Sequence, residues 1–458
     1  MGCEKHLNII KNTENLFKKG NIEGRKIAIR VLEYALKKVD TYKAVKRTIN
    51  IKGDKLFVGK NEYDLSNLRN IYVLGAGKAT FEIAKALEET FQERIRDGVI
   101  IEKRGRGKKL VKIRVLEADH PIPSESGHEG AIEVTKIAEQ AGEGDLVFVA
   151  VTGGCSALMP LPDAGLTLED KRKVNRLLLE CGATIDEINT VRKHLSRIKG
   201  GKLALMIHPA EIVNLIVVDE VAGKPWGPTI PDETTFEDAV AVLKKHNLWG
   251  VLPENVKLHL EKADPVNETP KPREFEAVGV KARTVILATN EDACKAAEEE
   301  AKRLGYKALI LTTVLEGESK EVGIMLSAVA REVESKGRPI EQPCVIISGG
   351  ETTVTIVGEA GEGGRNQELA LSASLKIAES ENIVLASLGT DGTDGPTDIA
   401  GAIVDGYTAG RAKQLGIDII DELKNHNSSH VFRALGDAIY TGPTGTNVMD
   451  IQVIVVTK

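Results

Sequence analysis

Cysteine and aromatic residues are both scarce in this chain of 458 residues. Its five cysteines stand far apart and include no Cys-x-x-C pair, which argues against a disulfide framework and against a zinc site. Reduced thiols of this kind are typical of a cytoplasmic protein. Aromatic residues make up only 4% of the chain, so its apolar mass is aliphatic. That composition favours buried parallel strands covered by helices.

The chain also lacks long apolar runs and an excess of positive charge. No stretch of 18 uninterrupted apolar residues occurs, so we expect no membrane span, and the first 20 residues have no signal-peptide core. The formal net charge is −6, with 61 Lys and Arg interspersed among 67 Asp and Glu. Non-specific nucleic-acid binding usually requires a basic excess. We therefore expect neither nucleic acid nor a membrane as a partner.

Four apolar runs each end in a glycine-rich turn. The runs cover residues 70–74, 146–151, 344–347 and 383–388, and the turns follow at 75–80, 152–157, 348–352 and 389–395. Continuous apolar runs predict strands that are buried on both faces, with helices above and below a mostly parallel sheet. In such sheets ligands bind beyond the carboxyl ends of the strands. The recurrence predicts an α/β fold with its binding residues in these turns.

The length predicts two or three domains. Residues 263–273 contain three prolines and no apolar period, as expected of a surface connector, and residues 284–289 begin a new alternation of strands and helices. We therefore predict two Rossmann-like α/β domains with mostly parallel sheets around an interdomain cleft, residues 1–275 and 276–458. An amphipathic helix is expected at residues 22–39. The last strand, residues 451–456, could return to either sheet.

Glycine turns between a strand and a helix can bind anions. They expose backbone N–H groups at the start of the helix, and glycine permits close approach. The predicted phosphate-binding residues are Gly75, Gly77, Gly153, Gly154, Ser156, Gly349 and Gly350. The first turn is not a P-loop, and Thr80 stands where a dinucleotide fingerprint needs its third glycine. Glu102, at the end of the next strand, still fits a nicotinamide-dependent enzyme.

Two cations stand where helices are expected to begin, Lys78 and Arg365. A helix start disfavours a cation unless an anion shares the site, and the planar Arg365 side chain suits a carboxylate or a phosphate. The fourth turn carries three carboxylates within eight residues, and hard oxygen ligands suit Mg²⁺. We predict Lys78, Arg365 and Asp391 as catalytic residues. Asp391, Asp394 and Glu351 are the predicted Mg²⁺ ligands, with Asp391 or Asp394 as an alternative acceptor of the substrate proton.

Three further residues could take part in chemistry, namely Cys155, His120 and His194. No partner is tied to any of them by sequence spacing. We interpret Cys155 as a packed thiol and the two histidines as structural or solvent-facing.

Nine short blocks follow one another along the chain. They are Gly-Ala-Gly-Lys-Ala (75–79), His-Pro-Ile-Pro (120–123), Thr-Gly-Gly-Cys-Ser-Ala-Leu (152–158), Lys-Gly-Gly-Lys-Leu-Ala (199–204), Gly-Pro-Thr-Ile-Pro-Asp (227–232), Ser-Gly-Gly-Glu-Thr (348–352), Gly-Gly-Arg-Asn-Gln-Glu (363–368), Gly-Thr-Asp-Gly-Thr-Asp-Gly (389–395) and Gly-Pro-Thr-Gly-Thr-Asn (442–447). With these blocks, in this order and over nearly its whole length, the chain resembles the glycerate 2-kinase family, whose C-terminal half is known as the MOFRL domain.

The resemblance implies ATP- and Mg²⁺-dependent phosphorylation of D-glycerate at its 2-hydroxyl, giving 2-phosphoglycerate and ADP. Lys78 and Arg365 match the lysine and arginine suspected in the catalytic cleft of the family. We expect Arg365, Asn366 and Glu368 to bind the substrate, and whether Arg365 takes a carboxylate or a phosphoryl group stays open.

Some points stay open within the resemblance. Similar proteins have been labelled hydroxypyruvate reductases, so a nicotinamide-dependent reductase is the alternative. Residues 217–226 are shorter than the family's usual stretch before Gly-Pro-Thr, which puts fine specificity in doubt. A homodimer is compatible with the sequence, which does not decide the oligomeric state.

Overall fold

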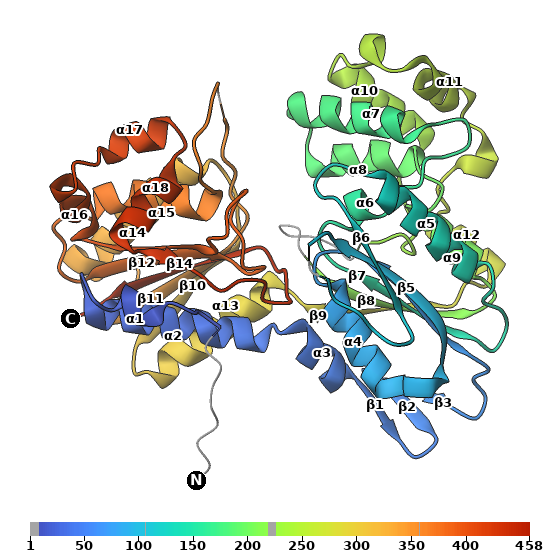
Figure 1. Ribbon diagram of the computed structural model, residues 1–458, viewed down its shortest axis with the longest axis horizontal. Coiled ribbons are helices and arrows are strands. Elements are labelled where there is room, and N and C mark those ends of the chain that lie inside the picture. The colour runs from blue at the N-terminus through green and yellow to red at the C-terminus, as the bar shows by residue number, and fades with distance from the viewer. Residues whose placement is uncertain (1–8, 106, 219–225, 357) are drawn as a thin grey trace. The chain divides into compact units, whose positions relative to one another are not determined.

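The computed structural model describes residues 9–105, 107–218, 226–356 and 358–458. These form two compact units (Figure 1). The central unit takes its described residues from the ranges 41–217 and 225–287, and the terminal unit takes its own from 1–40, 218–224 and 288–458. The expected shortening within residues 217–226 lies largely outside the described residues.

The central unit is built on a six-stranded sheet in the order β6-β5-β4-β7-β8-β9. Its strands are β4 (Ile71–Ala76), β5 (Ile95–Lys103), β6 (Arg114–Ala118), β7 (Leu146–Val151), β8 (Glu211–Val217) and β9 (Ala282–Ala288). The pairings that join β6, β5, β4, β7 and β8 are all parallel, as the apolar runs predict. A small antiparallel sheet precedes it, with β1 (Ile49–Lys52), β2 (Lys55–Val58) and β3 (Asn61–Asp64).

Helices cover both faces of the central sheet (Figure 1). One face carries α4 (Thr80–Phe91), followed by η1 (Gln92–Arg94) and backed by α3 (Thr41–Thr48). The other face carries α5 (Glu125–Ala138), α6 (Cys155–Leu158) and α9 (Lys202–Ile207). Because β4 and β7 are adjacent, the glycine turns that follow them lie side by side at one edge of the sheet.

A group of helices with its own apolar core completes the central unit. Its elements are α7 (Leu168–Glu180), α8 (Ile185–His194), α10 (Phe236–Lys245), η2 (Trp249–Val251) and α11 (Glu254–Lys262). The chain continues through η3 (Pro265–Asn267) to α12 (Pro272–Val278), whose Phe275 lies against Gly201 before α9. Three of these helices, α7, α8 and α10, start with a threonine cap and an acid three residues later. Such capping boxes satisfy the first N–H groups of a helix and fix where it begins.

The terminal unit contains a second six-stranded sheet in the order β10-β11-β15-β12-β13-β14. Its strands are β10 (Lys307–Leu315), β11 (Cys344–Gly350), β12 (Ile383–Gly389), β13 (Gly401–Asp405), β14 (Ala438–Ile439) and β15 (Asp450–Val456). The α/β class is confirmed, but a mostly parallel sheet is wrong for this unit. Only β10 and β11 pair in parallel, because the last strand inserts between β11 and β12 and runs against both.

Helices also cover both faces of this sheet (Figure 1). One face carries α2 (Ile22–Lys38) and α13 (Asn290–Arg303), with α1 (Thr13–Leu16) beside them. The other carries α14 (Ser319–Lys336), α15 (Arg365–Lys376) and α18 (Ser428–Leu435), with α16 (Thr408–Gln414) and α17 (Ile419–Lys424) next to them. Leu369 of α15 and Phe432 of α18 are fully buried in the core between helices and sheet.

Residues 9–40 belong to the same compact unit as residues 288–458, unlike the expected division into 1–275 and 276–458. The helix expected at residues 22–39 is present as α2, and it contacts β12 and β15. Its Arg25 is fully buried and donates to Asp405 at 2.6 Å and to Asp437 at 2.8 Å. Burial alone would lower the pKa of Arg25, but the two aspartates outweigh burial and raise it. A buried guanidinium requires such partners, which ties α2 to this unit.

The proline-rich segment at residues 263–273 is packed into the central unit instead of forming a surface connector. Its Thr269 is fully buried, and the hydroxyl donates to the carbonyl of Thr234 at 3.1 Å. The strand expected to open the second domain is β9, which completes the central sheet. Pro270 is also buried, whereas Pro265 is exposed, so this proline-rich segment is a partly buried corner of the central unit.

Candidate functional site

The backbone N–H groups of the glycine turn after β4 are already hydrogen-bonded within the protein. The amides of residues 77–81 all donate to acceptors within the central unit, at distances of 2.8–3.4 Å. The two glycines are explained by close packing: a Cβ on Gly75 would lie 2.3 Å from the Ala150 carbonyl, and one on Gly77 would lie 2.1 Å from the Thr152 hydroxyl. The backbone at 77–81 therefore offers no spare donor for the phosphate predicted here, and the side chain of Lys78 is what this turn contributes.

Glu102, at the end of β5, accepts a hydrogen bond from the Phe81 amide at 3.1 Å and is buried. In a dinucleotide-binding enzyme an acid at this place binds the ribose. Here the carboxylate holds the first turn of α4. The sequence suggested a nicotinamide-dependent enzyme through the glycine turn after β4 and through Glu102, and both are explained by internal hydrogen bonds.

The turn after β7 has the opposite character. Among the described residues, the structure shows no acceptor for the N–H groups of Gly153, Gly154 and Ser156. Gly154 has a φ of +85°, and a Cβ there would lie 2.9 Å from His120 Cδ2 and 3.4 Å from Lys78 Cγ. Unpaired amides beside a lysine and a histidine form an anion-binding arrangement. The central unit thus brings together Lys78 with the predicted Gly153, Gly154 and Ser156.

Basic side chains that the sequence analysis assigned no role lie near this turn. Lys199 follows α8, and burial lowers its pKa to about 8, with the charges of Cys155 and Arg192 also acting on it. Cys155 itself is buried, as expected for a packed thiol. His194 is fully buried and hydrogen-bonded to Glu268 at 2.8 Å, which fits its expected structural role. The only sequence signal for Lys199 was its place in the block at residues 199–204.

In the terminal unit, Arg365 is the first residue of α15 and lies in a network of carboxylates. Its Nε and Nη2 donate to the two oxygens of Asp450 at 2.6 and 2.9 Å, and Nη1 lies 2.7 Å from Glu351 Oε1. Burial would lower the pKa of Arg365, but Asp450 and then Glu351 outweigh burial and raise it. Asp450 begins β15 and is fully buried. Sequence reasoning missed it, because only the strand order reveals its place.

Asp391 lies near Asp450 at the edge of the sheet. Its Oδ1 accepts from the amide and the hydroxyl of Thr393 at 2.9 and 3.0 Å. Asp391 Oδ1 and Asp450 Oδ1 lie 3.6 and 3.5 Å from the point where a Cβ on Gly389 would stand. The predicted Arg365, Glu351 and Asp391 are therefore assembled around Asp450. Their catalytic and metal-binding roles stay predictions.

Asp394, predicted as a metal ligand, caps the start of α15. It is buried, and it accepts from the amides of Asn366 and Gln367 at 3.1 and 2.9 Å and from their side chains at 3.3 and 3.1 Å. Burial, and then the charge of Asp450, raise the pKa of Asp394 to about 6. Four N–H donors leave this carboxylate little capacity for a cation. Its observed contacts are those of a residue that positions Arg365.

The other predicted substrate-binding residues point into the unit. Asn366 is buried and accepts from the Ser387 hydroxyl at 2.6 Å. Glu368 is also buried, with its carboxylate 3.0 Å from His426 Nδ1. Both side chains are thus occupied by internal contacts, which leaves Arg365 as the member of this block whose side chain is partly exposed.

The paired glycines at the end of β11 are required by packing. A Cβ on Gly349 would lie 1.9 Å from Asn290 Oδ1, and one on Gly350, at φ +145°, would lie 2.3 Å from the backbone of Leu315. Substitution at either position would force the neighbouring backbone or a buried amide to move. Their predicted phosphate binding stays a prediction beside this structural requirement.

Known proteins match this chain over nearly its whole length. Residues 27–261 match the family described as Domain of unknown function (DUF4147), and residues 344–450 match the MOFRL family. A glycerate 2-kinase of Pyrococcus horikoshii is 45% identical over 439 residues, which cover 95% of this chain and 98% of that protein. The crystal structure of a glycerate kinase from Thermotoga maritima has a TM-score of 0.80 at 37% identity, covering 94% of this chain and 99% of that one. The chain belongs to the glycerate 2-kinase family.

The reductase label also occurs among similar proteins. A protein of Agrobacterium vitis that bears the provisional name hydroxypyruvate reductase is 37% identical over 389 residues, covering 84% of this chain and 98% of that protein. In this member of the glycerate 2-kinase family, the turn after β4 and Glu102 lack the free groups that a dinucleotide would need. The local geometry therefore favours the kinase relatives.

The donor groups of this family member fit Mg²⁺ in type. No cluster of three or more His, Cys, Asp or Glu in the described ranges could hold a metal ion by itself. Mg²⁺ does not require such a cluster, because it is usually bound by one or two carboxylates, waters and substrate phosphates. Asp391 and Glu351 are both partly exposed, and their roles as Mg²⁺ ligands stay predictions.

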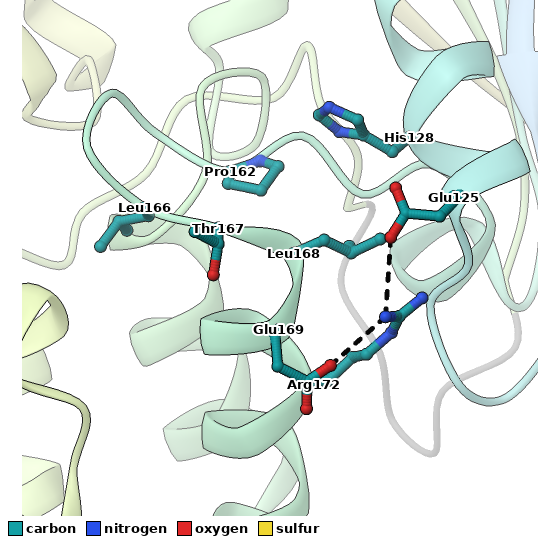
Figure 2. A pocket seen from close by; sticks show the side chains of 8 residues that line it. All are labelled: Glu125, His128, Pro162, Leu166, Thr167, Leu168, Glu169 and Arg172. Carbon is teal, nitrogen blue, oxygen red and sulfur yellow. Dashed lines mark hydrogen bonds and ion pairs between the residues drawn. The ribbon is translucent and has the colours of Figure 1, made fainter.

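One surface cavity of the central unit is lined by residues of neither the turn after β4 nor the turn after β7. Its volume is about 370 Å³, and it lies between α5 and the start of α7 (Figure 2). Its one arginine, Arg172, contacts Glu169 at 3.3 Å and Glu125 at 3.7 Å, as Figure 2 shows. Two carboxylates already neutralise this cation, so the cavity does not suit an anionic substrate.

In the described part of the chain, no helix is both long enough and apolar enough to cross a membrane.

Proposed function

We propose that this protein transfers the γ-phosphoryl group of ATP to the 2-hydroxyl of D-glycerate, giving 2-phosphoglycerate and ADP. The observation that carries the proposal is the match to a glycerate 2-kinase over 95% of the chain at 45% identity. In the reaction the hydroxyl oxygen attacks the γ-phosphorus, the bond to the bridging oxygen of ADP breaks, and the hydroxyl proton passes to a base. Such a transfer depends mainly on positioning and on neutralising charge.

The central unit supports this proposal with groups that bind phosphate. The N–H groups of Gly153, Gly154 and Ser156 would hold phosphate oxygens, since they have no acceptor among the described residues. Lys78, whose side chain passes beside Gly154, would neutralise charge on the transferred group. Lys78 is partly buried, so its charge is less screened by water than that of a surface lysine.

The terminal unit supplies Arg365 and the carboxylates around it. Arg365 would bind an anionic group of the reactants, because its guanidinium is held in place by Asp450 and keeps part of its surface exposed. Asp391 and Glu351 would hold Mg²⁺, which when bound neutralises charge on the phosphate oxygens. Asp391 is alternatively the base that accepts the hydroxyl proton. These two roles of Asp391 predict different kinetics.

Steady-state kinetics with purified protein tests the proposal. The wild type should consume ATP only in the presence of D-glycerate and a divalent ion, and phosphorus NMR should show the phosphate on the carbon that bears a single hydrogen. Oxidation of a nicotinamide by hydroxypyruvate, without ATP, would instead support the reductase. An Asp391→Asn variant that regains its rate at high Mg²⁺ has lost a metal ligand, whereas a uniformly low rate indicates a lost base.

Variants of the two cations test their roles. Lys78→Ala and Arg365→Ala should each lower kcat by on the order of 10²–10³, by analogy with other electrostatic stabilisers of a transition state. The matched controls are Lys60→Ala and Arg331→Ala, which remove exposed cations from the same units. Normal turnover in a folded Lys78→Ala or Arg365→Ala variant would remove that residue from the mechanism.

A further inference from the structure

Four basic side chains gather in the interior of the central unit, behind the turn after β7. They are Lys171 of α7, Arg192 of α8, and Lys199 and Lys202 of the block at residues 199–204. Burial, and then the charges of the other three, hold the pKa of Lys171 well below its usual range. Burial also lowers the pKa of Arg192 and of Lys202. Like charges that are removed from water destabilise one another unless an anion lies among them.

The carboxylates around this basic cluster are already committed. Their basic partners and distances are Asp163 with Lys202 at 3.2 Å, Asp232 with Lys193 at 2.6 Å, and Glu268 with His194 at 2.8 Å. Lys171 donates to the Leu195 carbonyl at 3.0 Å, and Arg192 donates to the amide oxygen of Asn175 at 2.9 Å. Neutral acceptors satisfy donors without cancelling charge. Within the described ranges, Arg192 and Lys199 have no carboxylate partner.

The two uncompensated cations are also the accessible ones. Lys171 is buried, whereas Arg192 and Lys199 keep part of their surface exposed. Lys199 lies close enough to Cys155 for their charges to interact, and Cys155 stands between Gly154 and Ser156, whose N–H groups have no acceptor in the described part of the chain. The cluster therefore adjoins the proposed phosphate-binding turn. An anion bound there would supply the missing negative charge.

We propose that Arg192 and Lys199 bind the carboxylate of the acceptor substrate, next to the turn that holds the transferred phosphate. The assignment rests on the proposed kinase function. A planar guanidinium suits the two oxygens of a carboxylate, and Lys199 adds a second charge-assisted bond. The subsite also explains how an enzyme of this kind selects glycerate over glycerol, which presents the same hydroxyl but no anion.

The test compares Arg192→Gln and Lys199→Met with Lys173→Met, which removes an exposed lysine from α7. The KM for D-glycerate should rise about 10- to 100-fold in the first two variants, which is the loss expected for a hydrogen bond to a charged group. The KM for ATP should stay within about twofold, and Lys199→Arg should recover most of the affinity for glycerate. A rise in the KM for ATP alone would place a nucleotide phosphate on the cluster and overturn the proposal, as would no change in either KM.

Thermal unfolding gives a second measurement that does not need turnover. D-glycerate should raise the Tm of the wild type and of Lys173→Met, but much less that of Lys199→Met, whereas glycerol should have no such effect. Without ligand, Lys199→Met should be at least as stable as the wild type, because it removes repulsion between Lys199 and the other cations of the cluster. If Lys199 had a structural role, the variant would instead be less stable than the wild type. If the wild type shows the glycerate shift but no kinase activity, the proposed function fails while the subsite stands. Equal glycerate shifts in all three proteins would overturn the subsite alone.

Discussion

Replacing Asp394 by alanine tests whether this residue positions Arg365 or binds metal. The variant removes the side-chain cap of α15, which costs about 0.5–2 kcal/mol, and leaves the buried Asn366 side chain without one acceptor, which costs about 1–3 kcal/mol. The Gln367 side chain keeps its contact with Thr397 at 3.3 Å, so no second full penalty is expected. The start of α15 should therefore lose about 2–4 kcal/mol of local stability, roughly 30- to 1,000-fold in an opening equilibrium.

Hydrogen exchange measured by mass spectrometry on peptides from α15, in buffer without divalent ions, reads this loss directly. Asp398→Ala is the control. The carboxylate of Asp398 is 73% exposed and contacts Arg433 at the surface, so its removal should change the local stability by less than about 0.5 kcal/mol. A metal ligand would behave differently: the variant would match the wild type without Mg²⁺ and differ only when Mg²⁺ is added. That result would refute the capping role.

The effect of Asp394→Ala should also depend on pH with a definite sign. Burial, and then Asp450, raise the pKa of Asp394 to about 6, so the folded wild type holds this proton more tightly than the unfolded chain does. The stability contributed by Asp394 is therefore greater at pH 5 than at pH 8, and it falls as the pH rises through the window between the unfolded and folded pKa values. After correction for intrinsic exchange rates, the variant should lose more protection at pH 5. A larger loss at pH 8 would contradict the assigned direction.

Two further predictions concern the fold and the thiols. Arg25→Met should lower the stability of the terminal unit by about 3–5 kcal/mol in thermal unfolding, because it leaves two buried aspartates without this partner. The control Lys26→Met removes an exposed lysine and should change the stability by less than about 0.5 kcal/mol, and equal Tm values for the two variants would show that Arg25 does not hold α2 to this unit. Iodoacetamide at pH 8 should modify Cys181, which is partly exposed, well before Cys294 and Cys344, because burial raises their pKa values to about 12 and about 11 and keeps them as thiols; peptide mass spectrometry showing early labelling of Cys294 would contradict this.

The elements that could be predicted from the sequence are those whose pattern is local. The apolar runs before the four glycine turns are strands β4, β7, β11 and β12, each ending at its turn. The helix α2 follows the expected apolar period. What this period could not show is the surface that α2 covers, because an amphipathic face fits any apolar sheet. The choice is made by Arg25, whose two aspartate partners lie hundreds of residues away.

Strand direction was the part of the fold that local pattern could not supply. An apolar run such as residues 451–456 reads the same whether its neighbours run with it or against it. Its position between β11 and β12 makes the terminal sheet mostly antiparallel, and it brings Asp450 to the edge where Gly350 and Gly389 end their strands. The acid that holds Arg365 was therefore invisible until the strand order was known.

The candidate site shows the same limit at the level of single residues. Asp391 and Asp394 are identical in type and stand three positions apart, yet one lies at the sheet edge and the other is saturated by amides of α15. The glycine turns after β4 and β7 likewise look alike in sequence. The N–H groups of residues 77–81 are all hydrogen-bonded, whereas those of Gly153, Gly154 and Ser156 have no acceptor among the described residues. Composition and spacing indicate which segments can bind an anion. The hydrogen bonds seen in the structure then show which N–H groups and side chains of those segments are not already bonded within the protein.

The distribution of charge is another property that composition does not reveal and the structure does. A formal net charge of −6 describes the whole chain and says nothing about Arg192 and Lys199, which have no carboxylate partner among the described residues. Because a partly buried charge is less well solvated than a fully exposed one, an anionic ligand beside these two cations would stabilise them. The balance of charge within this basic cluster therefore supports a substrate anion beside the block at residues 199–204, whose sequence did not by itself indicate a ligand.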